Sequence, residues 1–242
     1  MTETEVAGKL YIVTTPIGNL EDITLRALNV LREVELIAAE DTRRTQILLR
    51  HYDIRTRTVS YHSFNEHRKT AELLAQVASG LRLAVVSDAG TPCIADPGFL
   101  MVREAVKMGI EPVVVPGVSS LTFAVAASGL PSDRFDFYGF LPVKSGRKHR
   151  VLEEIRDNGR TAVVFESPYR VGKTLQAIAE SIGADTAVVL VREATKLHEQ
   201  IIRGRAGELA AVGADKNWKG EFVMVIDPGA GKNCPNVDDD CL

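Results

Sequence analysis

Short apolar runs alternate with amphipathic segments along most of this chain. Residues 10–13, 36–39 and 83–86 form runs of the kind that fills buried parallel strands. Between such runs, apolar residues recur at helical spacing, and Gly or Pro punctuates the segments. Over roughly the first 130 residues this alternation predicts an α/β domain with a mainly parallel, doubly wound sheet and helices on both faces.

The same pattern predicts where elements begin and which side chains they bury. Strands are expected at residues 10–13, 36–39, 58–61, 83–86 and 112–115, and helices from about residues 23, 42, 65, 97 and 119. The expected helix N-caps are Thr42, Asn65 and Asp96, with Pro97 as the first residue of the fourth helix. The side chains expected to face the core are Leu25, Leu28 and Leu31 in the first helix, and Phe99, Val102 and Val106 in the fourth.

Near Pro131 the sequence becomes rich in turn formers, aromatic and basic residues, which is typical of the entry to a second domain. Beyond it, strands are expected at residues 161–165, 187–191 and 222–226, several of them antiparallel, and helices at 168–182 and 206–212. The expected parts are an N-terminal arm (1–8), an N-terminal α/β domain (9–130), a C-terminal mixed α/β domain (131–228) and a disordered acidic tail (229–242).

Composition and charge narrow the class of protein. No apolar run in the 242 residues approaches the roughly 20 that span a bilayer, and the first residues lack the features of a secretory signal, so a cytoplasmic protein is expected. The cysteines, Cys93, Cys234 and Cys241, are odd in number and lack C-x-x-C spacing, so neither a disulfide framework nor a metal site is expected. A net charge of −3 argues against nonspecific, charge-driven binding to nucleic acid.

Candidate chemistry begins where the run at residues 83–86 stops in the loop SDAGTPCIADPG. A strand, a polar loop and a capped helix are typical of the ligand-binding edge of an open α/β sheet. A second loop, PGVSS, follows the next strand, and Ser119 and Ser120 there offer hydroxyls and helix N-terminal amides. Glycine and aspartate also favour plain turns, so a simple connection is the alternative interpretation.

Other motifs are weaker signals. TPIGN follows the first strand, where a dinucleotide-binding protein carries G-x-G-x-x-G, but it holds only one glycine, so a phosphate cradle is not expected. In the second half, charged clusters at residues 166–170 and 192–199 follow strands and a WKGE turn precedes the last strand, and the three could share a cleft. A basic run could hold a polyphosphate backbone, but taken alone a solvated helix start is the favoured interpretation; the run comprises Lys144, Arg147, Lys148, His149 and Arg150.

Taken together, eight motifs in this order resemble one family over nearly all of residues 9–228: TPIGNLEDITLRAL, AEDTR, SDAGTPCIADPG, VPGVSS, FYGFLP, ESPYR, REATK and KGE. The family is the tetrapyrrole methylase-like methyltransferases. The resemblance is closest to those members that use S-adenosylmethionine to methylate a ribose 2′-hydroxyl, that of a decoding-centre cytidine in 16S ribosomal RNA. It implies two α/β domains with the ligand in a cleft between them, a homodimer, 16S rRNA or the small ribosomal subunit as partner, and no metal.

The resemblance also implies site residues. The residues that it assigns to S-adenosylmethionine binding are Ile17, Asp88, Thr91, Ile94, Ser119, Ser120, Phe165 and Ala194, with less certainty for Gly90 and Glu221. A ribose hydroxyl needs a general base or a cation that stabilises the alkoxide, so the catalytic candidates are Asp41, Glu166, Lys196 and Glu221. The sequence does not choose among these four.

The chain departs from the family pattern at three positions. Cys93 and Ala194 replace the more usual leucines, and Tyr169 stands where histidine is common. The helical C-terminal extension of longer members is also missing. Two alternative functions remain at this stage: a methyltransferase acting on a tetrapyrrole or other small molecule, and an RNA-binding assembly factor without catalysis. A cleft lined by Arg43, Arg44, Arg147, Lys148 and Arg150 would favour RNA.

Overall fold

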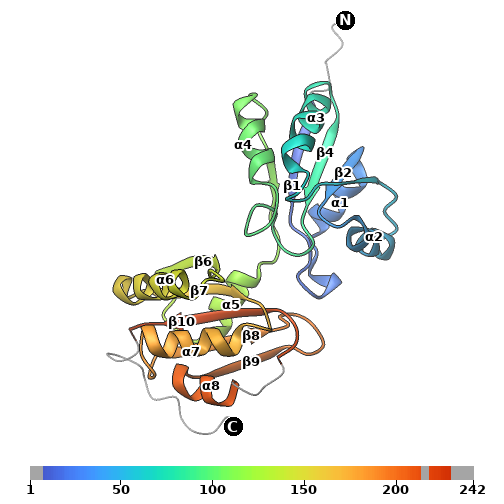
Figure 1. Ribbon diagram of the computed structural model, residues 1–242. Coiled ribbons are helices and arrows are strands. Elements are labelled where there is room, and N and C mark those ends of the chain that lie inside the picture. The colour runs from blue at the N-terminus through green and yellow to red at the C-terminus, as the bar shows by residue number, and fades with distance from the viewer. Residues whose placement is uncertain (1–7, 214–217, 230–242) are drawn as a thin grey trace, which may run out of the picture. The chain divides into compact units, whose positions relative to one another are not determined.

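The computed structural model describes residues 8–213 and 218–229, which form two compact units, divided between Ser119 and Ser120. Each unit is built around its own sheet, and the two units are described separately here (Figure 1). In the described ranges, no helix is long and apolar enough to cross a membrane.

Unit 1 holds a parallel five-stranded sheet in the order β3-β2-β4-β1-β5. Its elements are β1 (Lys9–Val13), the 3-10 turn η1 (Leu20–Asp22), α1 (Leu25–Glu33), β2 (Leu36–Ala39), α2 (Thr42–His51), β3 (Arg57–Ser60), α3 (Glu66–Ala78), β4 (Arg82–Val86), α4 (Phe99–Lys107) and β5 (Val113–Val115). Alternate residues of the strands pack against α1 and α2 on one face and against α3 and α4 on the other. The doubly wound sheet is therefore confirmed.

Unit 2 holds a mixed five-stranded sheet in the order β6-β7-β10-β8-β9. Its elements are α5 (Ser120–Ser128), β6 (Phe135–Phe140), α6 (Ser145–Asn158), β7 (Thr161–Glu166), α7 (Val171–Ser181), β8 (Ala187–Arg192), β9 (Gln200–Arg205), α8 (Ala206–Gly213) and β10 (Phe222–Asp227). Only β6 and β7 pair in parallel; the other neighbours are antiparallel, as expected for this half. The face opposite α5 packs against α6, α7 and α8.

Two expectations about helix ends and faces, and one about a strand, are wrong. Leu25 is 80% exposed, because α1 begins at this residue and buries Ala27, Leu28 and Leu31 instead. The N-cap of α2 is Asp41, whose carboxylate accepts a hydrogen bond from the Arg43 amide, rather than Thr42. The expected N-cap of α3, Asn65, is confirmed in position, although its side chain makes no cap hydrogen bond. The strand expected to be buried at residues 112–115 is the edge strand β5.

The fourth helix differs most from its prediction. Gly98, with φ +133°, is the N-cap of α4 in place of Asp96. Met101 and Ala105 face the core, whereas Phe99 and Val106 are exposed. The apolar residues of this helix form two overlapping stripes at helical spacing, so periodicity alone selected the wrong one.

The boundary between the units also differs from the expected position after residue 130. Ala124 of α5 packs with Val189, Val191 and Val225 of the second sheet, so this small-residue helix belongs to unit 2. The sequence analysis also missed β6 and β9, and it anticipated α6 only as a helix start. The expected arm and acidic tail lie outside the described residues, apart from Gly8 and Gly229.

Candidate functional site

Four of the sequence motifs lie side by side at the carboxyl edge of the unit 1 sheet. The strands β2, β4, β1 and β5 are consecutive neighbours and parallel, so the loops that follow them leave at the same edge. These loops carry AEDTR, SDAGTP, TPIGN and PGVSS respectively. The edge therefore brings together motifs that are up to about a hundred residues apart in the sequence. The SDAGTP and PGVSS loops were expected to be adjacent, but the loop after β1 lies between them.

Thr14 and Thr15 join three of these loops. The Thr15 amide donates to the Gly90 carbonyl at 2.9 Å, and the Gly90 amide donates to the Thr15 carbonyl at 3.1 Å. The hydroxyls of Thr14 and Thr91 are 3.0 Å apart. A Cβ on Gly117 would lie 2.9 Å from Thr14 Cγ2, so the β5 loop also packs closely on Thr14. These buried threonines were not predicted as part of the site. The sequence feature that could have indicated them is a pair of hydroxyl residues directly after an apolar strand.

The loop after β4 has an unusual backbone. Cys93 (φ +76°) and Ala95 (φ +63°) adopt left-handed conformations that residues with a Cβ rarely take, and Gly90 and Gly98 also have positive φ. The Cys93 amide donates to the Pro97 carbonyl, which closes the loop. Ile94, which lies between these two residues, is 44% exposed. Such strain persists only where the surroundings enforce it, and it concentrates at ligand sites.

Acidic residues of the loop after β2 form hydrogen bonds with Asp88 of the loop after β4. Asp88 accepts a hydrogen bond from the Asp41 amide at 3.0 Å, and its own amide donates to Glu40 at 3.3 Å. Arg44 lies 3.6 Å from the Asp88 carboxylate. Burial raises the pKa of Glu40, with the nearby Asp88 charge adding to the effect. Asp88 thus lies at the predicted edge, held by two neighbours that the sequence did not pair with it.

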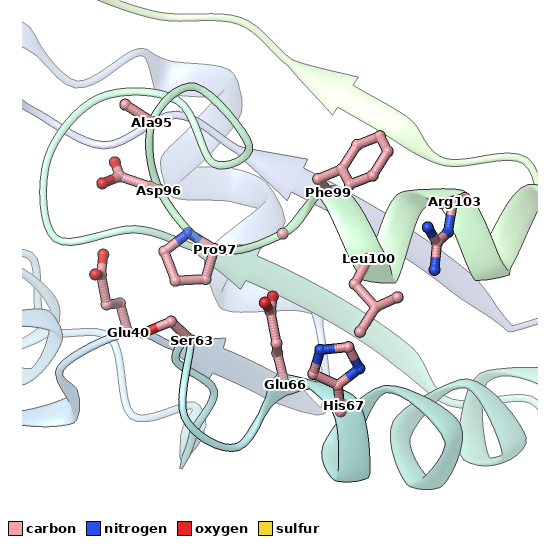
Figure 2. Close-up of a pocket in the computed structure, with 11 residues that line it drawn as sticks. Glu40, Ser63, Glu66, His67, Ala95, Asp96, Pro97, Phe99, Leu100 and Arg103 are labelled. Atoms are coloured by element: carbon pink, nitrogen blue, oxygen red, sulfur yellow. The ribbon is translucent and has the colours of Figure 1, made fainter. Parts of the chain in front are cut away.

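A hollow of about 490 Å³ opens next to the same loop, between the end of β2 and the starts of α3 and α4. Figure 2 shows Glu40, Ser63, Glu66 and His67 along the lower side of it, with Asp96, Pro97 and Phe99 above them. The hollow is lined by both acidic and basic side chains. Among the described residues, no cluster of His, Cys, Asp or Glu has the arrangement of a metal site.

Two of the four catalytic candidates have geometry that disfavours a base. Hydrogen bonds from the Arg43 side chain and amide lower the pKa of Asp41 to about 2, so its carboxylate is a weak base. Glu166 is fully buried: its carboxylate accepts from the Ser167 amide and the Thr174 hydroxyl, and pairs with Arg170 at 3.1 Å. These contacts give Glu166 the surroundings of a structural ion pair.

The other two candidates meet at one point. Lys196 Nζ lies 3.0 Å from a carboxylate oxygen of Glu193 and 3.0 Å from one of Glu221. Burial opposes the charge of Lys196, but hydrogen bonds to both carboxylates outweigh it and raise the lysine pKa. Burial likewise opposes ionisation of Glu193, yet the Glu221 amide and Lys196 lower the pKa of Glu193. Glu193 is a member of this cluster that the sequence analysis did not single out.

The backbone around this cluster is as strained as the β4 loop. Glu193 has φ +51° and Thr195 has φ +64°. The Glu193 amide donates to the Glu221 carbonyl and its side chain accepts from the Glu221 amide, so REATK and KGE are joined on both sides. Two functional candidates of unit 2, Lys196 and Glu221, are therefore fixed by one strained loop and one turn.

The remaining predicted residues are dispersed. Ile17 is buried beside Gly90, and Ser119 and Ser120 lie at the start of α5. Phe165 and Ala194 are half-buried against the α5 face of the second sheet. The basic run is split, because Lys148 points inward to Thr174 while Lys144, Arg147 and Arg150 are exposed on α6 or just before it. Arg43 and Arg44 are engaged by Asp41 and Asp88.

Comparisons with known proteins place the chain in a family. The profile of Tetrapyrrole (Corrin/Porphyrin) Methylases matches residues 9–210. Ribosomal RNA small subunit methyltransferase I of Thermotoga maritima is 48% identical over 219 residues, which cover 90% of this chain and 98% of that protein. The chain belongs to the ribosomal RNA small subunit methyltransferase I family. The protein of this name from Escherichia coli O157:H7 is also 48% identical, over 91% of this chain and 78% of the relative.

Solved structures support the fold of this methyltransferase family member. Cobalt precorrin-4 methyltransferase aligns over 93% of this chain and 97% of its own with a TM-score of 0.68 and 20% identity. Diphthine synthase aligns over 90% of this chain and 88% of its own with a TM-score of 0.70 and 17% identity. The expected tetrapyrrole methylase-like fold is confirmed, and the absent G-x-G-x-x-G pattern agrees with it.

Proposed function

We propose that this protein is an S-adenosylmethionine-dependent methyltransferase of small-subunit ribosomal RNA, and that it methylates the ribose 2′-hydroxyl of a decoding-centre cytidine. The observation that carries the activity is the 48% identity to ribosomal RNA small subunit methyltransferase I over nearly the whole of that relative. The choice of a cytidine ribose 2′-hydroxyl as methyl acceptor rests on the resemblance of the sequence motifs to the family.

The edge of the unit 1 sheet suits a ligand without phosphate groups. Asp88 offers carboxylate oxygens, and Thr91 and Ser119 offer hydroxyls, for amino, carboxylate and ribose groups. Exposed Ile94 offers apolar surface for a base. We assign S-adenosylmethionine binding to Ile17, Asp88, Gly90, Thr91, Ile94 and Ser119 of this edge, and to Ser120, Phe165 and Ala194 of unit 2.

Lys196 and Glu221 are the proposed catalytic residues. Bound S-adenosylmethionine supplies an electrophilic methyl group. The Glu221 carboxylate accepts the proton of the ribose hydroxyl, and the Lys196 ammonium stabilises the negative charge that develops on that oxygen. Glu193 positions Lys196. Asp41 and Glu166 are retained as weaker candidates, because their oxygens are occupied by arginine and threonine partners.

The test is transfer of a labelled methyl group to small ribosomal subunits that lack the modification, followed by mapping of the labelled nucleotide. We expect label on a ribose 2′-oxygen of the rRNA. Lys196→Met and Glu221→Gln are each expected to lower kcat by about 10²- to 10⁴-fold. Lys219→Met is the matched control, because this exposed lysine lies on the same turn as Glu221.

Calorimetry with S-adenosylhomocysteine separates chemistry from binding, because the catalytic variants should bind it as the wild type does. Label on a tetrapyrrole or on protein, with none on RNA, would overturn the proposed substrate. No binding of S-adenosylhomocysteine at millimolar concentration would overturn the enzyme assignment altogether.

A cytoplasmic homodimer completes the proposal. Apolar side chains exposed on α4 and β5 support self-association: Phe99, Val106, Met108 and Val114. Sedimentation equilibrium should give twice the 26.4 kDa chain mass. Val106→Asp should shift the protein toward monomer, and a wild-type monomer at micromolar concentration would contradict dimerisation.

A further inference from the structure

Two segments of unit 2 concentrate positive charge. Residues 141–150 and 167–173 contain six Lys or Arg and no Asp or Glu, although the whole chain has a net charge of −3. The first segment follows β6 and the second follows β7. Because β6 and β7 are parallel neighbours, both segments leave the sheet at the same edge. The fold therefore brings two acid-free segments together.

Two of the six cations tie the segments to each other. The Arg170 guanidinium pairs with Glu166 and also donates to the Leu141 carbonyl. Lys148 Nζ donates to the Thr174 hydroxyl at 2.9 Å. Burial lowers the pKa of Lys148; the Glu166 carboxylate opposes this shift, and the positive charges of Arg170 and Lys173 add to it. The contacts of Arg170 and Lys148 with buried groups therefore fix the conformation of the two segments at this edge of the sheet.

The other four cations, Lys144, Arg147, Arg150 and Lys173, are exposed and form no ion pair with any residue in the described ranges. Tyr169 lies beside the anchored Arg170 and is 87% exposed, with no ring or hydrogen-bond partner among those residues. An exposed aromatic ring among unpaired cations is the combination that proteins use for single-stranded nucleic acid, in which rings stack on bases and cations hold phosphates.

We propose that the β6–β7 edge surface, defined as Lys144, Arg147, Tyr169 and Lys173, binds a single-stranded segment of RNA. The three cations contact successive phosphates, and the Tyr169 ring stacks on an unpaired base. A duplex is disfavoured because its stacked bases leave no face for Tyr169. This inference rests on the proposed function, since it names the surface that holds the RNA substrate.

The test measures binding of a fluorescein-labelled single-stranded RNA of about ten nucleotides by anisotropy at several salt concentrations. The triple variant Lys144→Ala/Arg147→Ala/Lys173→Ala should bind more weakly and reduce the slope of log K against log salt by about 2. Tyr169→Ala should weaken binding about 5- to 100-fold at unchanged slope, and Tyr169→Phe should restore it.

Arg160→Ala is the matched control, because Arg160 precedes β7 and so lies at the opposite end of that strand. It should keep the wild-type affinity and slope. With small ribosomal subunits, the triple variant should raise KM and leave kcat unchanged. All substituted side chains are exposed, so melting temperatures should stay close to that of the wild type.

Wild-type affinity and salt slope in the triple variant would overturn the proposed surface, even if methylation is normal. RNA binding that depends on these residues in a protein that methylates no RNA would instead overturn the proposed function and leave the surface standing. Preferential binding of the wild type to anionic phosphatidylserine vesicles, at equal phosphate concentration, would replace RNA by a lipid surface and also refute the inference.

Discussion

At the scale of single residues, Gly220 constrains the position of the proposed catalytic lysine. Its φ is +93°, and a Cβ there would lie 2.5 Å from Glu193 Cγ and 2.6 Å from Oε1. Glu193 in turn holds Lys196 at 3.0 Å. A methyl group at Gly220 must therefore displace the carboxylate that positions the ammonium.

Gly220→Ala is expected to lower kcat at least tenfold and to cost about 1–3 kcal/mol of stability. Methyl-transfer assays and thermal melting measure the two effects. Gly109→Ala is the control, because Gly109 also has positive φ but no atom within 4 Å of its Cβ position. Equal kcat in the two variants would show that the contact with Glu193 is unimportant.

The Lys196 cluster should be insensitive to pH across the neutral range. The pKa of Lys196 is raised above 10.5, so its stabilising contribution is complete below that pH and is lost as pH rises through the folded value. The pKa of Glu193 is lowered below 4.5, so its contribution is complete above that pH and is lost as pH falls through the folded value.

The difference in melting temperature between wild type and Lys196→Met should therefore stay constant from about pH 6 to pH 9 and shrink above about pH 10.5. Differential scanning fluorimetry in overlapping buffers measures it. A difference that changes near pH 7 would mean that another group controls the charge of this cluster.

The sequence could name Lys196 and Glu221 as candidates because Lys196 follows one apolar strand and Glu221 directly precedes another. It could not pair Lys196 with Glu193, since that contact depends on a left-handed backbone and on a turn 28 residues away. Asp41 shows the reverse case. Its position was predicted, but only the structure shows that Arg43 occupies its carboxylate.

At the scale of elements, a buried polar chain joins α6, β7 and α7. Thr174 accepts a hydrogen bond from Lys148 and donates one to Glu166 at 2.6 Å. Its hydroxyl is therefore the link between a buried cation and a buried anion, and neither can turn to water when the link is removed.

Thr174→Val should lower the free energy of unfolding by about 1–3 kcal/mol, with an unchanged m-value in urea. Thr161→Val is the control at the start of β7, because the buried Thr161 hydroxyl has no hydrogen-bond partner among the residues that the structure describes. That control should be neutral or stabilising. A loss in Thr161→Val as large as that in Thr174→Val would refute the linking role.

Helices with a single apolar stripe and strands with a continuous apolar run were predicted well. Elements whose apolar pattern was ambiguous or irregular were not. The buried runs of β2 and β4 could be read directly from composition. In α4, the choice between two apolar stripes depends on contacts with α3 and the sheet, which the sequence does not show. β6 was missed because its FDFYGF sequence, with a bulge near Gly139, breaks the alternation of a regular strand.

At the scale of the whole molecule, the two units have separate hydrophobic cores. Leu31 is fully buried in the unit 1 core, and Leu175 is fully buried in the unit 2 core. Each core is closed by residues of its own unit. The division was predicted from the change in texture near Pro131, but its position depends on where α5 packs.

Leu31→Ala and Leu175→Ala should each cost about 2–5 kcal/mol, and each should lower the unfolding midpoint of its own unit. Hydrogen exchange followed by peptide mapping can assign the loss of protection to residues 8–119 or 120–229. Equal loss of protection in both units from either substitution would show that the chain unfolds as one cooperative body.

The strand order of unit 1 has a consequence for how the protein is made. The first strand, β1, pairs only with β4 and β5, and the register joins Lys9 to Arg82. During synthesis, this strand must wait for its partners to leave the ribosome before it can enter the sheet. The loops proposed to bind the methyl donor thus come together only when the chain has emerged to about Ser119. A nascent fragment shorter than this should have no affinity for the donor, so the ligand cannot act as an early folding aid.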